Sequence, residues 1–203
     1  MPRVAYSAVP VSLLLIWVGS GCGGSTTRTP AAPSSCAVHA VGKRLVDARG
    51  RTVYRYPGYR VPATQIKCSG KAVWVLFHGG GEMSQEAYVG ARSHDTGRTW
   101  KLLLSEPYFG VKAPHTIDAY SGPWTIVGER GAYFVGSCPA CGRGTVSLTV
   151  TRDGGKRFRR YPLPGLTGFY STGIRVDGDT VTITGRNQFR IGPRRRTISL
   201  TVD

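Results

Sequence analysis

Arginine side chains gather in two stretches of the chain, and the chemistry they suggest is the binding of anions. Residues 157–161 have the sequence RFRRY, and residues 186–196 end in three consecutive arginines. Guanidinium groups hold carboxylates and phosphates through paired hydrogen bonds, and aromatic rings between them can stack on a flat ligand. The predicted anion-binding residues are Arg157, Arg159, Arg160, Arg194, Arg195 and Arg196.

Two other motifs could serve catalysis, but turns and loops explain them. Residues 78–81 (HGGG) could be an oxyanion loop, which would need a Gly-x-Ser-x-Gly turn between a strand and a helix. The nearest candidate, residues 169–173 (FYSTG), lacks the first glycine, so a loop between sheets is favoured for 78–81. His115 and Asp118 have no identifiable partner for acid–base or metal chemistry, and a turn after Pro114 accounts for them. No metal or cofactor is predicted.

The N-terminal segment predicts export from the cytoplasm. Arg3 precedes an apolar run over residues 9–18, which is too short to span a bilayer. This arrangement is typical of a secretory signal peptide, which we expect over residues 1–21. The small residues just before Cys22 resemble the lipobox of bacterial lipoproteins, although Gly19 stands where leucine is usual.

The lipobox resemblance implies that Cys22 carries a lipid and anchors the protein to the extracytoplasmic face of the cell membrane. Ordinary secretion is the alternative. Residues 22–35 contain no bulky apolar side chain, so they are expected to form a flexible tether. The folded domain is expected over residues 36–203.

The charge of the chain favours an anionic partner. It carries 27 Lys and Arg against 11 Asp and Glu, a formal net charge of +16. Such a field attracts anionic lipids, wall polymers and acidic glycans, and it weakens as salt rises. Arginines interleaved with aromatic residues also bind single-stranded nucleic acid. A half-buried strand produces the same alternation of arginine and aromatic residues. Because the protein is expected to be exported, we favour an envelope partner over nucleic acid.

Four further cysteines fit an oxidising compartment. Cys36, Cys68, Cys138 and Cys141 allow three pairings. We favour Cys36–Cys68, which would tie the start of the domain to its first sheet, and Cys138–Cys141, which would close a tight loop. A Cys-x-x-Cys motif also serves redox or zinc chemistry, but neither a helix-opening context nor two more ligands accompany it here.

A short pattern occurs twice in the domain. Residues 93–100 (SHDTGRTW) and 151–158 (TRDGGKRF) share the spacing hydroxyl-x-Asp-x-Gly-x-x-aromatic. The aspartate can accept backbone N–H bonds, the glycine suits positive φ, and the aromatic ring can fold back over the strands. The pattern therefore predicts two hairpin turns. Their structural residues are Ser93, Asp95, Gly97, Trp100, Thr151, Asp153, Gly155 and Phe158.

The repeated pattern resembles the Asp-box, or BNR, repeat family. The resemblance implies antiparallel blades of a sialidase-like β-propeller, in which each box joins the third and fourth strands of a blade. In that family the box is structural, so it specifies no activity.

For a sialidase, the resemblance also implies an arginine triad, a Tyr–Glu nucleophile pair and an aspartate acid/base at the propeller centre. If two copies share a propeller centre, the candidate catalytic residues are Arg190, Arg175, Glu129 and Tyr170, which lie on or beside predicted inner strands and their loops. The family's aromatic-Arg-Ile-Pro motif has only a displaced counterpart in residues 189–193 (FRIGP), and no glutamate stands in a recognisable nucleophile context. We therefore favour a non-catalytic scaffold or binding module for an anionic envelope polymer, glycan, lipid surface or envelope protein. A sialidase-type glycoside hydrolase is the alternative.

The alternation of apolar and polar residues predicts strands throughout the domain and no helix after residue 22. Three units are expected, over residues 72–104, 124–163 and 173–202, and the third lacks a fourth strand. Residues 47–57 (DARGRTVYRYP) resemble the missing part, so the N-terminal strand is expected to complete the last blade. Closed propellers have four to eight blades. The options are an open propeller, a ring shared by a homodimer, or an additional partial blade from residues 36–68.

Overall fold

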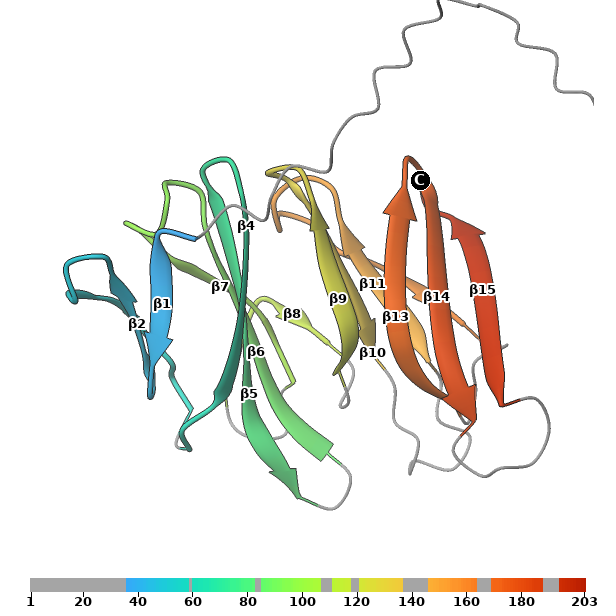
Figure 1. Cartoon of the computed structure of the whole chain (residues 1–203), viewed down its shortest axis with the longest axis horizontal. Helices are drawn as coiled ribbons and strands as arrows, with labels where there is room; N and C mark the ends of the chain where they lie inside the picture. The colour runs from blue at the N-terminus through green and yellow to red at the C-terminus, as the bar shows by residue number, and fades with distance from the viewer. Residues whose placement is uncertain are drawn as a thin grey trace, which may run out of the picture. The chain divides into compact units, whose positions relative to one another are not determined.

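The computed structural model describes residues 36–58, 60–82, 85–106, 111–117, 121–136, 146–163, 169–187 and 194–203. All of them belong to one unit, Pro33–Asp203. Within these ranges, fifteen strands form four sheets, named A to D below (Figure 1). This part of the chain contains no helix, and so none that could cross a membrane. The prediction of an all-β fold is confirmed.

The strands of each sheet are neighbours in the order in which they follow along the chain. Sheet A contains β1 (Val38–Val41), β2 (Arg44–Asp47) and β3 (Thr52–Arg55). Sheet B contains β4 (Ala63–Ser69), β5 (Ala72–Glu82), β6 (Gln85–Ser93), β7 (Lys101–Ser105) and β8 (His115–Thr116). Sheet C contains β9 (Ser121–Val127), β10 (Gly131–Gly136), β11 (Ser147–Thr151) and β12 (Arg159–Pro162). Sheet D contains β13 (Phe169–Asp177), β14 (Thr180–Asn187) and β15 (Arg195–Thr201). Neighbours pair antiparallel, except for the parallel pair β7 and β8.

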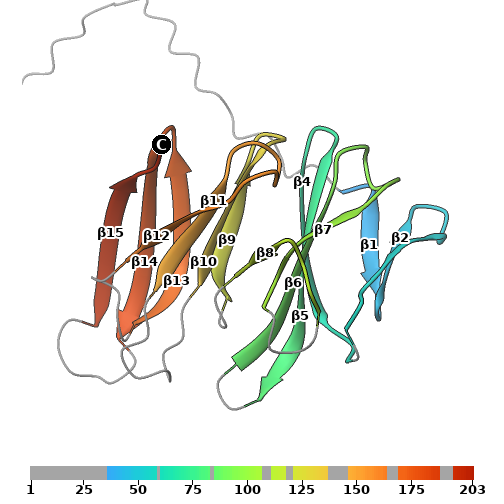
Figure 2. The ribbon, with the colours of Figure 1, turned by 180° about the vertical axis from the view of Figure 1, so that it is seen from behind.

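Sheets B and C are covered on both faces because their strands carry apolar residues at consecutive positions. In β5, Trp74 packs against sheet C, whereas Phe77 packs against sheet A. In β10, Phe134 packs against sheet B, whereas Val135 packs against sheet D. Neighbouring side chains of a strand point to opposite faces. The four sheets therefore stack in the order A, B, C, D, which both ribbon views show (Figures 1 and 2).

The prediction that the N-terminal strand completes the last sheet is wrong. Strands β1 to β3 pair with one another, and β13 to β15 form their own sheet. Leu45 in β2 and Tyr56 just after β3 pack into an apolar cluster with sheet B, which holds sheet A on the side of B away from sheet C. Asp47 does form a turn like those of the repeated pattern, because its Oδ1 accepts N–H bonds from Arg49 and Arg51 at 2.9 and 3.0 Å. A ring shared by two copies stays a prediction.

One disulfide joins sheets A and B. Cys36 precedes β1 and Cys68 lies in β4, and their Cα atoms are 5.7 Å apart. The predicted Cys36–Cys68 pairing is confirmed. Cys22, Cys138 and Cys141 lie outside the described residues.

Residues 78–81 are part of a strand, so the prediction of a loop is wrong. His78 pairs with Ala63 of β4 and with Tyr88 of β6, and its ring stacks on that of Tyr88 with centroids 4.6 Å apart. The register shifts between His78 and Gly81, and Gly80 has a φ of 80°. Glycine adopts a positive φ at a β-bulge. The bulge therefore explains why this part of the strand contains glycines.

Candidate functional site

The two repeated patterns form turns with the same hydrogen bonds. The first turn motif (residues 93–100) joins β6 to β7, and the second turn motif (residues 151–158) joins β11 to β12. In both, the glycine N–H donates to the hydroxyl of the first residue, at 2.8 and 2.9 Å. The next two N–H groups donate to Oδ1 of the aspartate, and the glycines have φ of 92° and 86°. The pattern thus closes each hairpin through side-chain hydrogen bonds.

Each turn motif also contacts the preceding sheet. In the second turn motif, Gly155 lies against Leu103 of β7, where a Cβ would overlap the leucine side chain. The ring of Phe158 lies 4.7 Å from that of His115 in β8. The first turn motif contacts sheet A in the same way, with its tryptophan ring 5.4 Å from that of Tyr54 in β3. The motifs are therefore points of attachment between sheets as well as turns.

Acid is expected to weaken the second turn motif. Burial raises the pKa of Asp153, but hydrogen bonds from Arg157, Thr151 and Lys156 outweigh it and lower the pKa from 3.8 to about 2. Because this pKa is lower than in the unfolded chain, ionised Asp153 stabilises the fold above about pH 4, and that stabilisation is lost as the pH falls towards 2. Asp153→Asn should therefore lower the Tm at pH 7 more than at pH 2.5. An equal loss of Tm at both pH values would contradict this assignment.

The candidate catalytic residues do not converge. Glu129, in the turn after β9, accepts the backbone N–H of Lys71 at 2.8 Å and so links sheet C to sheet B. Tyr170 lies at the start of β13, which runs beside β9 in the same direction (Figure 1). Glu129 and Tyr170 are thus at opposite ends of neighbouring strands. Arg175 lies further along β13, and Arg190 lies outside the described residues.

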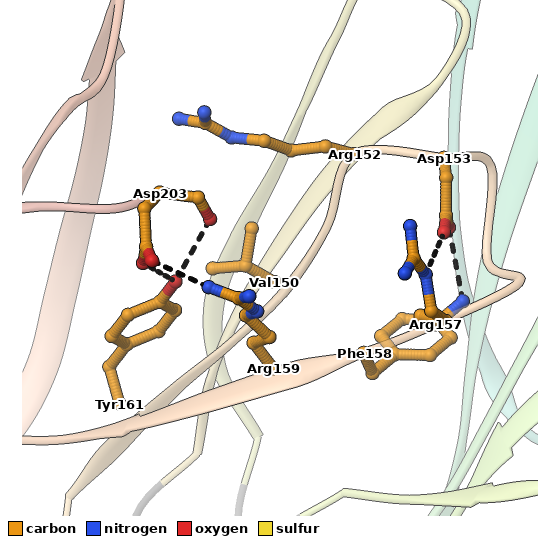
Figure 3. A pocket seen from close by; sticks show the side chains of 8 residues that line it. All are labelled: Val150, Arg152, Asp153, Arg157, Phe158, Arg159, Tyr161 and Asp203. Carbon is orange, nitrogen blue, oxygen red and sulfur yellow. Dashed lines mark hydrogen bonds and ion pairs between the residues drawn. The ribbon is translucent and has the colours of Figure 1, made fainter.

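A pocket of about 540 Å³ beside the second turn motif contains several predicted anion-binding residues (Figure 3). Its arginines already have carboxylate partners. Arg157 Nε lies 3.1 Å from Asp153 Oδ2, and Arg159 Nη1 lies 2.6 Å from Asp203 Oδ2. Arg152, also in the lining, pairs with Asp179 at 2.9 Å. Because each of these positive charges already has a carboxylate beside it, the pocket attracts an external anion less strongly than unpaired arginines would.

The other predicted anion-binding residues are distributed over two sheets. Arg160 lies on β12 and lines a separate pocket with His115. Arg195 begins β15, and Arg194 directly precedes it. Arg196 pairs with Gly185 and thus falls on the opposite face of sheet D from Arg195.

The outer face of sheet D, directed away from sheet C, is polar throughout the positions described. On the inner face, Ile174, Ile183 and Ile198 pack into the apolar cluster shared with sheet C. The alternate positions form four rows across the three strands. From one end to the other, these rows are Asp177–Thr180–Thr201, Arg175–Thr182–Ser199, Gly173–Thr184–Thr197 and Tyr170–Arg186–Arg195. We call this surface the arginine–hydroxyl face.

The arginines of the arginine–hydroxyl face have no ionic partner among the described residues. Arg175, Arg186 and Arg195 are exposed, and the four ion pairs found in this part of the chain involve other arginines. Arg186 lies directly opposite Arg195 on the neighbouring strand. Like charges in directly opposed positions destabilise a sheet. Only one carboxylate, Asp177, is among the outward residues described above.

Arg186 begins the arginine stretch 186–196 but is not among the predicted anion-binding residues, although the sequence contains a signal for it. Residues 180–186 and 195–201 alternate hydroxyl or arginine side chains with apolar or glycine residues at nearly every position. That period predicts strands with one polar face. The pairing of Arg186 with Arg195 depends on the register between β14 and β15, which neither segment specifies alone.

The fold and the site define the protein as a basic, all-β protein of four stacked sheets. No protein-family model matches the chain, and no relative was found among curated proteins. Within the described ranges, no three His, Cys, Asp or Glu side chains are grouped so that they could hold a metal ion. The function must therefore be argued from the geometry.

Proposed function

We propose that this chain is an exported lipoprotein whose β-domain is a non-catalytic binding module for an anionic partner in the cell envelope. The observation that carries the proposal is the arginine–hydroxyl face, with three exposed arginines that lack a carboxylate partner among the residues the structure describes. An anion bound there would supply the missing negative charge and relieve the repulsion between Arg186 and Arg195. The net charge of +16 would attract such a partner from a distance.

We further propose that the four sheets are an incomplete, sialidase-like propeller built on Asp-box repeats. The first turn motif joins the third and fourth strands of sheet B, and the second joins the third and fourth strands of sheet C. This is the position that the Asp-box resemblance implies. The separation of Glu129 from Tyr170 gives no support to a sialidase site within a single copy, so we favour binding without catalysis.

Replacing the three arginines by glutamine should weaken binding to a polyanion. The variant is Arg175→Gln/Arg186→Gln/Arg195→Gln in the full chain, and the probe is immobilised heparin at a series of salt concentrations. Each exposed ionic contact contributes up to about 1 kcal/mol, so the loss of three should reduce affinity by about 10- to 100-fold.

The matched control is Arg44→Gln/Arg55→Gln/Arg98→Gln, which removes the same charge from sheet A and the first turn motif. Arg44 and Arg55 are exposed and also directly opposed, so the control includes a comparable arginine pair. It should lose much less affinity than the sheet D variant. Equal losses in the two variants would mean that net charge alone drives binding, and would contradict a site on sheet D.

A further inference from the structure

We infer that the arginine–hydroxyl face binds a linear acidic polysaccharide whose sugars carry carboxylates. This inference rests on the proposed anion-binding function and specifies the ligand. The evidence is the combination of three chemical groups on one exposed sheet face: arginines with no ionic partner within the described ranges, rows of hydroxyls and an exposed aromatic ring.

The arginines are spaced for a ligand with repeated charge. Arg175 lies in the row of Thr182, and Arg186 lies four residues further along the same strand. At a rise of about 3.3 Å per residue, these rows are about 13 Å apart. A polymer with a carboxylate on successive units can contact both rows at once, with a separate carboxylate for each row. Guanidinium groups bind carboxylates through two parallel hydrogen bonds.

The hydroxyl rows lie between and beside the arginines. Thr182 Oγ1 and Ser199 Oγ are 3.0 Å apart across β14 and β15, and Thr184 lies opposite Thr197 in the next row. Each hydroxyl can donate one hydrogen bond and accept two, which matches the hydroxyls of a sugar chain. Threonine side chains in strands have few rotamers, so little rotamer freedom would be lost on binding.

Tyr170 adds a ring suited to a sugar face. Its side chain is 45% exposed, and it occupies the same row as Arg186 and Arg195. An exposed aromatic ring presents a flat apolar surface with a polar hydroxyl at its edge, and the C–H face of a pyranose packs on such a surface. The ring is thus placed to hold one sugar while the two arginines bind its carboxylate.

Gly173 itself adds no side chain to the middle of the face. It lies between the rows of Tyr170 and Arg175, and a Cβ at this position would lie 2.7 Å from Thr184 Oγ1. The side chain of Thr172, at the β-bulge, lies beside Thr184 with their hydroxyl oxygens 3.5 Å apart, so it adds a further hydroxyl between the ring and Arg175. A lipid headgroup is a poorer fit, because none of the outward strand positions that the structure describes on sheet D carries an aliphatic side chain that could enter a bilayer.

The test compares binding to probes that carry negative charge with and without sugar rings. Binding of the full chain to polygalacturonate, which has carboxylates on sugar rings, is measured beside poly-glutamate, which has carboxylates without sugars, and vesicles of phosphatidylglycerol. We expect at least tenfold tighter binding to polygalacturonate than to the other two. Tyr170→Ala and Thr182→Val/Ser199→Ala should each weaken polygalacturonate binding by about three- to tenfold and leave poly-glutamate binding unchanged. Circular dichroism melting curves verify that the variants are folded.

The outcomes distinguish this inference from the proposed function. Equal affinity for polygalacturonate and poly-glutamate, or no effect of the tyrosine and hydroxyl variants, overturns the polysaccharide inference while anion binding stands. Preference for the vesicles also overturns it in favour of a lipid surface. Failure to bind any of the three probes removes the proposed function itself.

Discussion

Replacing Gly155 by alanine is expected to lower the free energy of unfolding by about 2–5 kcal/mol. Gly155 has a φ of 86°, a conformation that costs an L-residue about 1–2 kcal/mol. Its new methyl group would also collide with Leu103 of sheet B, and overpacking of this kind costs about 1–3 kcal/mol. The change should be measured by urea denaturation of the full chain followed by tryptophan fluorescence.

The matched control for Gly155→Ala is Gly128→Ala, also in sheet C. Gly128 has a φ of 58°, but a Cβ there would meet no atom within 4 Å. The control should therefore show the backbone cost alone. Leu103→Ala should lower the free energy of unfolding less in the Gly155→Ala variant than in the wild type. In the variant, the truncation of Leu103 also removes the collision with the new methyl group. Equal destabilisation by the two glycine substitutions would show that the second turn motif does not hold sheets B and C together.

Truncation of Phe134 to alanine should cost about 3–5 kcal/mol, the range found when buried phenylalanines are removed. Phe134 is 1% exposed and fills the space between sheets B and C. Its ring lies parallel to that of Trp124, with centroids 5.6 Å apart, and 6.2 Å from that of Trp74. The loss should appear as a lower urea midpoint, together with a change in the native fluorescence of these tryptophans.

Phe134→Leu is the control for this prediction. It keeps most of the apolar volume, so its cost should be less than half that of alanine. Tyr170→Ala, at an exposed aromatic residue on sheet D, should change stability by less than about 1 kcal/mol. If Phe134→Ala were as mild as Tyr170→Ala, the stacking of sheets B and C through this cluster would be wrong.

The features predicted well from the sequence are those that depend on a few neighbouring residues. The turns at 93–100 and 151–158 close through side chains within the motif, so their spacing was sufficient to identify them. The Cys36–Cys68 pair followed from an even cysteine count and the position of the first strands.

The predictions that were wrong concern which strands lie next to one another in the fold. The turn residues of 47–57 predict a place in the last sheet because Asp47 resembles the aspartate of the repeated turn, but the apolar side chains of Leu45 and Tyr56 place these strands against sheet B. The sequence suggests Tyr170 and Arg175 as catalytic candidates, yet they share the outer face of sheet D with Arg186 and Arg195. Only the register between strands brings these four side chains to one surface.

The disulfide between sheets A and B determines how mechanical tension would pass through the domain. A pull on the chain before Cys36 reaches the sulfur–sulfur bond first and passes through Cys68 into β4. Strands β1 to β3 lie in the covalent loop that this bond closes, so they carry none of the load. For a protein tethered at its N-terminus, sheet A would stay folded under a drag force until sheet B yields or the disulfide is reduced.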